Sequence, residues 1–265
     1  MLQLHNITKT FAKGTVNEKT ALAGVDLHLE KGDFVTVLGS NGAGKSTLFG
    51  AIAGTFVSDT GTVVLDGKDI TNLPDYKRSK YIGRLFQDPL KGTAPSMTIE
   101  ENMALAYMRA SSHTSPFSMI GKKDREDFRS RLSMLGLGLE DRMDSPVGLL
   151  SGGQRQALTL LMATLVTPKL LLLDEHTAAL DPATAEKVLE LTKRIVAENN
   201  ITCLMITHNI PSALQLGNRT IMMNEGRIVL ELAGEQRRHI TTEQLLQAFH
   251  EHAAVSDRML FSTGI

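Results

Sequence analysis

The stretch that decides the fold is Phe34-Val35-Thr36-Val37-Leu38-Gly39-Ser40-Asn41-Gly42-Ala43-Gly44-Lys45-Ser46-Thr47. Its apolar first part, Phe34 to Leu38, predicts a buried strand, and we expect a helix from Ser46 to about Ile52. Between them, residues 39–46 match the complete pattern of a phosphate-binding loop. The alternative is a glycine-rich turn that binds nothing, and the strand before it and the helix after it argue against that reading.

The loop predicts how a nucleotide would be held. Its glycines let the backbone curl so that several N–H groups point at one anion, and the following helix adds its positive dipole end. Lys45 is expected to reach the β- and γ-phosphates, and the Ser46 hydroxyl is expected to bind Mg²⁺. The predicted nucleotide contacts are Gly39, Ser40, Asn41, Gly42, Ala43, Gly44, Lys45, Ser46 and Thr47.

A second apolar run, Leu170 to Leu173, is followed directly by Asp174 and Glu175. It predicts a central strand whose carboxyl end presents two carboxylates, and this is the edge where α/β sheets bind ligands. Asp174 suits a Mg²⁺ contact through water, and Glu175 suits a general base that orients the attacking water. Solvated acids at an exposed strand end are the alternative, which the phosphate loop makes less attractive.

The segment Leu150-Ser151-Gly152-Gly153-Gln154 predicts a second anion-binding helix end. Ser151 can cap the helix that follows, and the two glycines leave its amide groups bare. Because the phosphate loop already wraps one side of a nucleotide, a second such device suggests that the chain grips a nucleotide held by another copy. Two contacts of this kind form a two-fold interface. The plainer alternative is a Ser-capped helix after a glycine turn.

The rest of the chain alternates between predicted strands and helices. Further strands are expected at 81–86 and 201–207, with a hairpin at 219–232 turning at Glu225-Gly226. A long helix should start at Asp181-Pro182 and stop at Asn199-Asn200, and a short one should cover 211–216. This alternation favours a mainly parallel sheet covered on both faces.

The middle of the chain differs in character. Thr98 to Glu101 forms a capping-box pattern that predicts a helix start at Ile99, and a charged stretch at 122–135 predicts another helix. Residues 110–121, rich in Ser and Gly, predict a loop, and residues 88–148 are interpreted as an inserted, mostly helical subdomain. A last capping box at Thr241 to Gln244 predicts a C-terminal helix.

Composition restricts the function classes. The 265 residues are 42% hydrophobic and 22% charged with a formal net charge of −1, which is ordinary for a soluble protein and favours no nucleic-acid partner. The single Cys203 excludes an internal disulfide and is expected to be a buried thiol without chemistry. We expect no signal peptide, and no apolar run is long enough for a membrane span.

Taken together, these motifs resemble the nucleotide-binding domain of the ATP-binding cassette (ABC) superfamily over nearly the whole chain. Residues 39–47 resemble its Walker A loop and 170–175 its Walker B strand, and 150–154 are identical to its signature. The resemblance implies one α/β domain with a P-loop NTPase core, a mainly parallel sheet flanked by helices with an N-terminal antiparallel β part. The core would be 1–87 and 149–265, with the helical subdomain at 88–148 and the signature at its C-terminal end.

The resemblance also implies roles for single residues. Gln87 stands where the family has a glutamine that senses Mg²⁺, and with Glu175 and His208 it completes the expected catalytic set. His208 resembles the switch histidine that contacts the γ-phosphate; a satisfied loop histidine is the alternative. Asp181 lies in a segment resembling the D-loop, which crosses the dimer interface. Phe11 falls where the family stacks an aromatic on adenine; a core residue is the alternative.

One position departs from the family pattern. His176 follows Glu175 where the family usually has Pro, which frees φ and restores a backbone N–H. A catalytic role and a neutral local substitution both stay open for it. The run Glu-His-Thr-Ala-Ala-Leu-Asp at 175–181 resembles a bacterial subgroup linked to importers that use extracytoplasmic binding proteins, including ones proposed for aromatic amino acids.

The function that the resemblance implies is ATP binding and hydrolysis that energises a membrane transporter, with ATP and Mg²⁺ as cofactors. The implied partners are a second copy or a similar cassette, integral membrane permease subunits and an extracytoplasmic binding protein, with the chain peripheral at the cytoplasmic face. The main alternative is a soluble ABC ATPase of DNA repair, chromosome maintenance or translation; others are a phosphate-loop kinase and a pure binding module. Substrate and transport direction reside in other chains.

Overall fold

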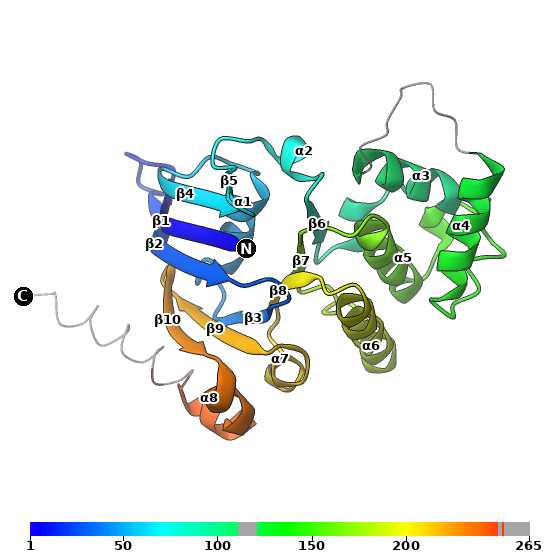
Figure 1. Ribbon diagram of the computed structural model, residues 1–265. Helices are drawn as coiled ribbons and strands as arrows, with labels where there is room; N and C mark the ends of the chain where they lie inside the picture. Colours follow the sequence, from blue (N-terminus) through cyan, green and yellow to red (C-terminus); the bar gives the residue numbers. More distant parts are fainter. Residues whose placement is uncertain (111–120, 249–250, 252–265) are drawn as a thin grey trace, which may run out of the picture. The chain divides into compact units, whose positions relative to one another are not determined.

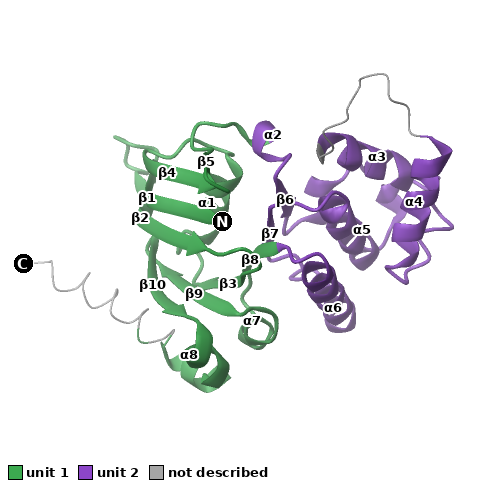
Figure 2. Cartoon of the chain, in the orientation of Figure 1, with its two compact units in different colours: residues 1–75, 202–265 green, residues 76–201 purple. Residues whose placement is uncertain are grey.

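The computed structural model describes residues 1–110, 121–248 and 251. It consists of two compact units, shown in different colours in Figure 2. Unit 1 combines the first and last parts of the chain, residues 1–75 and 202–265, and unit 2 is the continuous stretch 76–201. The chain therefore leaves unit 1 once and returns to it once.

The first sheet of unit 1 is antiparallel and has the strand order β2-β1-β4-β5 (Figure 1). Its strands are β1 (Leu2–Phe11), β2 (Lys19–Leu29), β4 (Thr60–Leu65) and β5 (Lys68–Asp69). The alternation typical of one buried face is visible in β1, where Leu2 and Leu4 are buried and Gln3 is not. This sheet confirms the expected antiparallel N-terminal part.

The second group of strands in unit 1 supplies its parallel core. It comprises β3 (Phe34–Gly39), β8 (Thr202–Ile206), β9 (Arg219–Asn224) and β10 (Arg227–Leu232). Strand β3 pairs in parallel with both β8 and β9, while β9 and β10 form the predicted hairpin. Every residue of β3 and of β8 is buried, as expected of strands covered on both faces.

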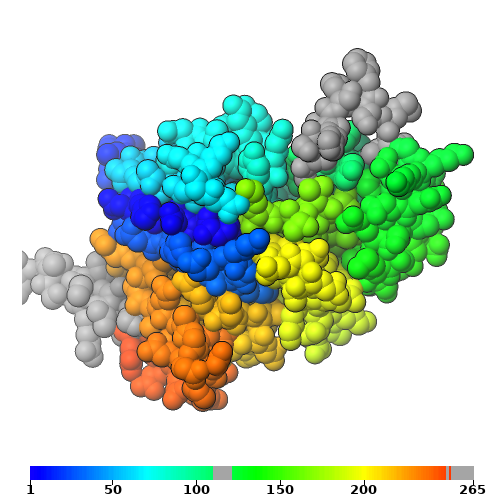
Figure 3. All heavy atoms as spheres, in the orientation of Figure 1, coloured from blue at the N-terminus to red at the C-terminus, as the bar shows by residue number. Residues whose placement is uncertain are grey.

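The two strand groups of unit 1 meet along β2. The Ala23 N–H donates to the Gly226 carbonyl in the β9–β10 turn at 2.9 Å. In Figure 3 the blue surface of the N-terminal strands accordingly borders the orange surface of the C-terminal strands. The hairpin tip is thus held against the antiparallel sheet.

Two helices in the described part of unit 1 begin within one residue of their predicted starts, whereas a further helix at 234–239 was not predicted. The three are α1 (Lys45–Ala53), α7 (Ile210–Leu216) and α8 (Gly234–His239), with residues 242–248 also helical. The Thr241–Gln244 capping box is present, with reciprocal hydrogen bonds of 2.9 and 3.2 Å. Arg237 of α8 is buried and donates to the Ala213 and Leu214 carbonyls, so it satisfies the end of α7.

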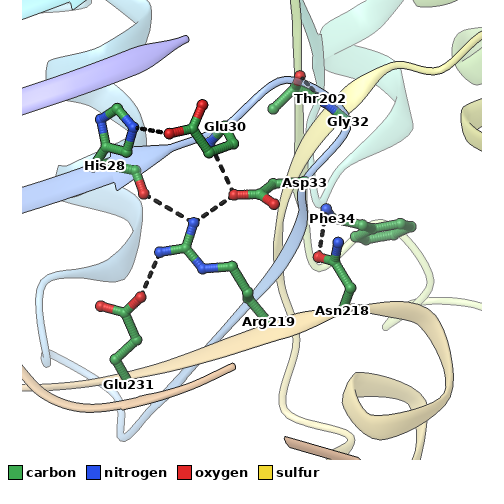
Figure 4. Close-up of polar contacts among 9 residues, drawn as sticks. All are labelled: His28, Glu30, Gly32, Asp33, Phe34, Thr202, Asn218, Arg219 and Glu231. Atoms are coloured by element: carbon green, nitrogen blue, oxygen red, sulfur yellow. Dashed lines mark hydrogen bonds and ion pairs between the residues drawn. The ribbon is translucent and has the colours of Figure 1, made fainter. Parts of the chain in front are cut away.

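A polar cluster joins three strands of unit 1 (Figure 4). Arg219 of β9 forms ion pairs with Asp33 and with Glu231 of β10, and it donates to the His28 carbonyl of β2 at 2.9 Å. Nearby, the Phe34 N–H donates to the Asn218 side chain at 2.9 Å. The guanidinium therefore holds the turn before β3 against the hairpin.

Unit 2 contains one parallel strand pair and a group of helices. The strands β6 (Ile82–Leu85) and β7 (Leu170–Asp174) pair in register from Ile82–Leu170 to Leu85–Leu173. The helices are α3 (Ile99–Ala110), α4 (Lys122–Ser133), α5 (Gly152–Thr164) and α6 (Pro182–Glu198), with 3-10 turns η1 (Pro89–Gly92) and η2 (Val147–Leu149). A short helix α2 (Asp75–Arg78) starts the unit.

A separate hydrophobic core holds α3, α4 and α5 together. Met103, Phe128 and Leu158 are its central members, one from each helix, and all are buried. Tyr107 packs edge-on against Phe128 with 6.1 Å between ring centroids. The predicted helix start at Ile99 is confirmed by the Thr98–Glu101 capping box.

Most predicted element boundaries hold within one or two residues, including the Asp181 cap and the stop at Asn199. The loop predicted at 110–121 lies outside the described residues except at its two ends. The predicted division into a core and a subdomain at 88–148 stays a prediction. Among the helices of the described ranges, none combines the length and the hydropathy that crossing a bilayer would require.

Candidate nucleotide-binding site

The phosphate loop of unit 1 connects the fully buried strand β3 to helix α1. The Ala43 N–H donates to the Ser40 carbonyl at 3.2 Å, which closes the turn. Gly44 occupies the N-cap of α1 with a φ of +102°, a left-handed conformation that favours glycine. A Cβ there would lie 2.5 Å from the Ala21 carbonyl oxygen. The backbone of the loop therefore runs close to β2, and the N-cap residue of α1 has no side chain that could cap the helix.

Lys45, the first residue of α1, lies folded over this loop. Only 6% of it is exposed, and its Nζ donates to the Gly39 and Ser40 carbonyls at 2.8 and 2.9 Å. The positive charge is thus fixed where the backbone N–H groups and the helix dipole also favour an anion. Ser46 is exposed and Thr47 is half-buried, so both hydroxyls lie at the surface end of the helix.

His208 follows strand β8 at the same end of the parallel sheet as the phosphate loop. Val37 of β3 lies opposite Ile206 of β8, so Gly39 and His208 are each two residues beyond this pair. His208 is exposed, and the next residue, Asn209, caps α7. The parallel register therefore brings the predicted switch histidine and the loop to one sheet edge.

Phe11 closes strand β1 and is 42% exposed, so it is not a core residue. Its ring meets Phe56 edge-on with 5.5 Å between centroids, and the Lys9 Nζ lies 5.7 and 5.4 Å from the two rings. An exposed ring held by a second ring is a surface on which a base can stack. Phe56 belongs to no motif or periodic pattern in the sequence, so its contact with Phe11 could not be predicted.

In unit 2, the ends of β6 and β7 place Gln87 and Asp174 together. Gln87 lies two residues beyond Leu85 and Asp174 one residue beyond Leu173, and these two leucines are opposite each other. Both polar residues line one cavity of about 520 Å³. Amide and carboxylate oxygens, like the Ser46 hydroxyl, are hard ligands of the kind Mg²⁺ prefers. Within the described residues, no cluster of three or more His, Cys, Asp or Glu forms a metal site by itself.

Glu175 directly follows this strand and has an unusual backbone. Its φ is +45°, a left-handed conformation that is uncommon for a residue with a side chain. Its carbonyl accepts from the Ala178 N–H at 3.0 Å, which starts a turn. Strained backbone of this kind is often found at functional sites, where the surroundings hold it in place.

The next residue, His176, is 3% exposed, and its Nε2 lies 3.1 Å from the Thr192 hydroxyl on α6. Burial lowers the pKa of His176 to about 4, so its ring is neutral at pH 7. The ring is therefore withdrawn from solvent and engaged with α6, which does not suit acid–base exchange with a nucleotide. The sequence offered no signal for Thr192.

The segment at 150–154 begins helix α5 as expected. The Gln154 N–H donates to Ser151 Oγ at 3.2 Å and the Ser151 N–H donates to Gln154 Oε1 at 3.1 Å, a complete capping box. Gly152 is exposed, whereas Gly153 is buried against Thr184 of α6. The two glycines thus have different surroundings.

Asp181 caps the other helix of this region. The Thr184 N–H donates to its carboxylate at 3.1 Å, and hydrogen bonds from Thr184 lower the pKa of Asp181. The side chain is exposed and stays ionised at neutral pH. Its observed role is that of an N-cap at the start of α6, while its predicted place at a dimer interface stays a prediction.

The structure thus distributes the predicted residues over both units. Phe11, residues 39–47 and His208 belong to unit 1, whereas Gln87, Asp174, Glu175, residues 151–154 and Asp181 belong to unit 2. Within each unit, neighbouring parallel strands bring the predicted polar groups to the same strand ends. The individual roles of these residues stay predictions.

Comparison with known proteins identifies the architecture. A sequence model described as "ABC transporter" matches residues 22–178. A tyrosine transport ATP-binding protein of Clostridioides difficile is 43% identical over 94% of this chain and 98% of its own length. The methionine import ATP-binding protein MetN of Vibrio vulnificus is 34% identical over 92% of this chain and 68% of its own length.

Solved structures agree with this result. The dimeric structure of the bacterial ABC transporter cassette MJ0796 has a TM-score of 0.77 and 31% identity, covering 91% of this chain and all of that one. The ADP conformation of the cassette MJ1267 has a TM-score of 0.74 and 29% identity, with coverage of 94% and 98%. These matches confirm the α/β P-loop fold and the family that the sequence motifs resemble. The chain belongs to the ABC transporter family, as an ATP-binding and ATP-hydrolysing subunit that energises transport.

Proposed function

We propose that this chain drives an importer of aromatic amino acids as one of two copies that close head-to-tail on two molecules of Mg·ATP. The observation that carries the dimer is that two helices of one chain, α1 after Gly44 and α5 after Ser151, begin in glycine-containing segments of the kind that can bind an anion. One nucleotide needs only one phosphate loop, so the second start suits the phosphates of ATP bound by a partner.

Support for hydrolysis comes from the residues around β7 and β8. Glu175 would take the role of general base and orient the attacking water, and His208 would contact the γ-phosphate. Ser46, Gln87 and Asp174 would hold Mg²⁺, which neutralises charge on the phosphates. Phe11 would stack on the adenine. Bound ATP adds contacts available only in the closed pair, so ATP favours closure and loss of the γ-phosphate favours opening.

The relatives' names support the proposed substrate class and the proposed direction of transport. The Clostridioides difficile relative is named for tyrosine transport and the MetN relative for methionine import, which supports an amino acid as substrate and import as direction. We propose integral membrane permease subunits as partners, an extracytoplasmic binding protein upstream of them, and a peripheral position at the cytoplasmic face. Residues 88–148 would pass the movement of the pair to the permease.

The first experiment measures steady-state ATP hydrolysis and ATP-dependent dimer formation on a sizing column. We expect Glu175→Gln to lose hydrolysis and to accumulate as a dimer with Mg·ATP. Glu186→Gln, an exposed change on α6, serves as the matched control and should behave as wild type. Hydrolysis by Glu175→Gln at the wild-type rate would overturn the assignment of the base, and a monomer under all conditions would overturn the dimer.

A second experiment addresses transport. The chain is purified with the polytopic membrane protein that accompanies it, and vesicles containing the complex are tested for ATP-dependent uptake of labelled tyrosine, with methionine as comparison. Tyrosine uptake that Lys45→Ala abolishes would support the proposal. Uptake of methionine without tyrosine would change the proposed substrate from tyrosine to methionine. The reproducible absence of a membrane partner would favour a non-transport ATPase.

A further inference from the structure

The segment after β7 combines a strained residue with a buried one. Glu175 has its left-handed φ of +45°, and it is followed directly by His176, which is 3% exposed. A left-handed conformation at a residue with a side chain persists only when its surroundings enforce it. His176, the next residue, is buried, so its contacts are one source of this restraint.

The restraint after Glu175 is a hydrogen bond to α6. His176 Nε2 lies 3.1 Å from Thr192 Oγ1, and Thr192 is fully buried. The same hydroxyl donates its single proton to the Val188 carbonyl at 2.8 Å. Since a hydroxyl has only one proton to give, it accepts from His176, so Nε2 carries the proton of the neutral ring.

Backbone hydrogen bonds close the segment after β7 on itself. The Ala178 N–H donates to the Glu175 carbonyl at 3.0 Å, and the Leu180 N–H donates to the Thr177 carbonyl at 3.1 Å. The segment after β7 therefore consists of two successive turns. The His176 side chain fastens the first of them to a long helix.

We propose that His176 is a positioning residue for Glu175, and that its hydrogen bond to Thr192 keeps the carboxylate of Glu175 in the orientation that hydrolysis requires. This inference rests on the proposed role of Glu175 as the base. Histidine lacks the ring that fixes φ in proline, the residue expected here from the family resemblance, so the segment needs another restraint. The buried hydrogen bond supplies that restraint through the side chain.

The test separates positioning from folding by changing Thr192, which lies on α6 at a distance of sixteen residues from His176. Thr192→Val keeps the shape of the side chain and removes the hydroxyl, whereas Thr192→Ser keeps the hydroxyl and removes a methyl group. Steady-state kcat and KM for ATP are measured for both, together with the melting temperature and ATP-dependent dimer formation.

We expect Thr192→Val to lower kcat about tenfold while KM for ATP changes less than twofold, because only the orientation of the base is affected. Thr192→Ser should keep the wild-type kcat even if its melting temperature falls. In the double variant with His176→Leu, the losses should not add, because both changes remove the same bond. The pH profile of kcat for Thr192→Val should keep the shape of the wild-type profile.

Wild-type kcat in Thr192→Val would overturn the inference, and so would equal losses of kcat in the Val and Ser variants, which would indicate a purely structural role. Additive losses in the double variant would also overturn it. The Glu175→Gln control distinguishes the two levels: if that variant hydrolyses ATP normally, the proposed base is wrong, whereas an inactive Glu175→Gln beside a normal Thr192→Val refutes the positioning role alone.

Discussion

Replacing Gly153 with alanine tests whether the second glycine of 150–154 is required by packing between helices. A Cβ at this position would lie 2.1 Å from Thr184 Cγ2, far inside contact distance. The obstacle is a single methyl group, since Thr184 Cβ would be 3.5 Å away and Oγ1 3.9 Å away. Gly153 is in the first turn of α5 and Thr184 is in the first turn of α6, so either the Thr184 side chain would have to rotate or the two helix starts would have to separate.

Overpacking of this kind costs about 1–3 kcal/mol. Alanine recovers up to about 1 kcal/mol because it favours helix more than glycine does. The net expectation for Gly153→Ala is therefore a loss of about 1.5 kcal/mol, the middle of the resulting range, which in a chain of this size lowers the melting temperature by roughly 3–6 °C.

The assay is thermal unfolding followed by circular dichroism for Gly153→Ala, Thr184→Ser and the double variant. Thr184→Ser removes the obstructing methyl group, so the double variant should recover most of the lost stability. Gly152→Ala is the matched control, because its Cβ would meet only the end of the Leu180 side chain at 3.3 Å. If the double variant is as unstable as Gly153→Ala alone, the contact with Thr184 is not what requires glycine.

Three further predictions concern other parts of the chain. Phe11→Ala should weaken ATP binding about tenfold through loss of stacking, whereas Phe11→Tyr should not, as measured with a fluorescent nucleotide. The lowered pKa of His176 means that its contribution to stability is complete above pH 6.5 and is lost as pH falls toward 4, by about 3 kcal/mol. Urea unfolding at pH 7 and at pH 4.5 should show this loss of unfolding free energy in wild type and not in His176→Gln. Arg219→Met should lower the free energy of unfolding by about 2 kcal/mol, because it leaves the largely buried Asp33 without its ion-pair partner. Arg238→Met, which breaks an exposed ion pair, should change this free energy by less than about 0.5 kcal/mol. Equal effects of the two variants would contradict this reasoning.

Much of the fold could be predicted because its signals are local. A capping box such as Thr98–Glu101 joins residues three apart, so its hydrogen bonds are implied by the sequence once a helix starts there. The buried strands β3 and β7 are short apolar runs that end at a glycine and at a carboxylate, and the hairpin turns at Glu225-Gly226 as predicted. Each of these features depends on neighbours in the chain.

The sequence by itself determined the phosphate loop at 39–47, the carboxylates after Leu173 and the second helix start at Ser151, because each is a continuous motif whose chemistry follows from residue type and spacing. Only the tertiary structure decided that Phe56 holds the ring of Phe11, that Thr184 needs glycine at 153, and that His176 binds Thr192. These pairs are joined by side-chain packing between residues separated by sixteen positions or more. No periodicity or local propensity encodes such contacts, since they arise only when separate strands and helices have come together.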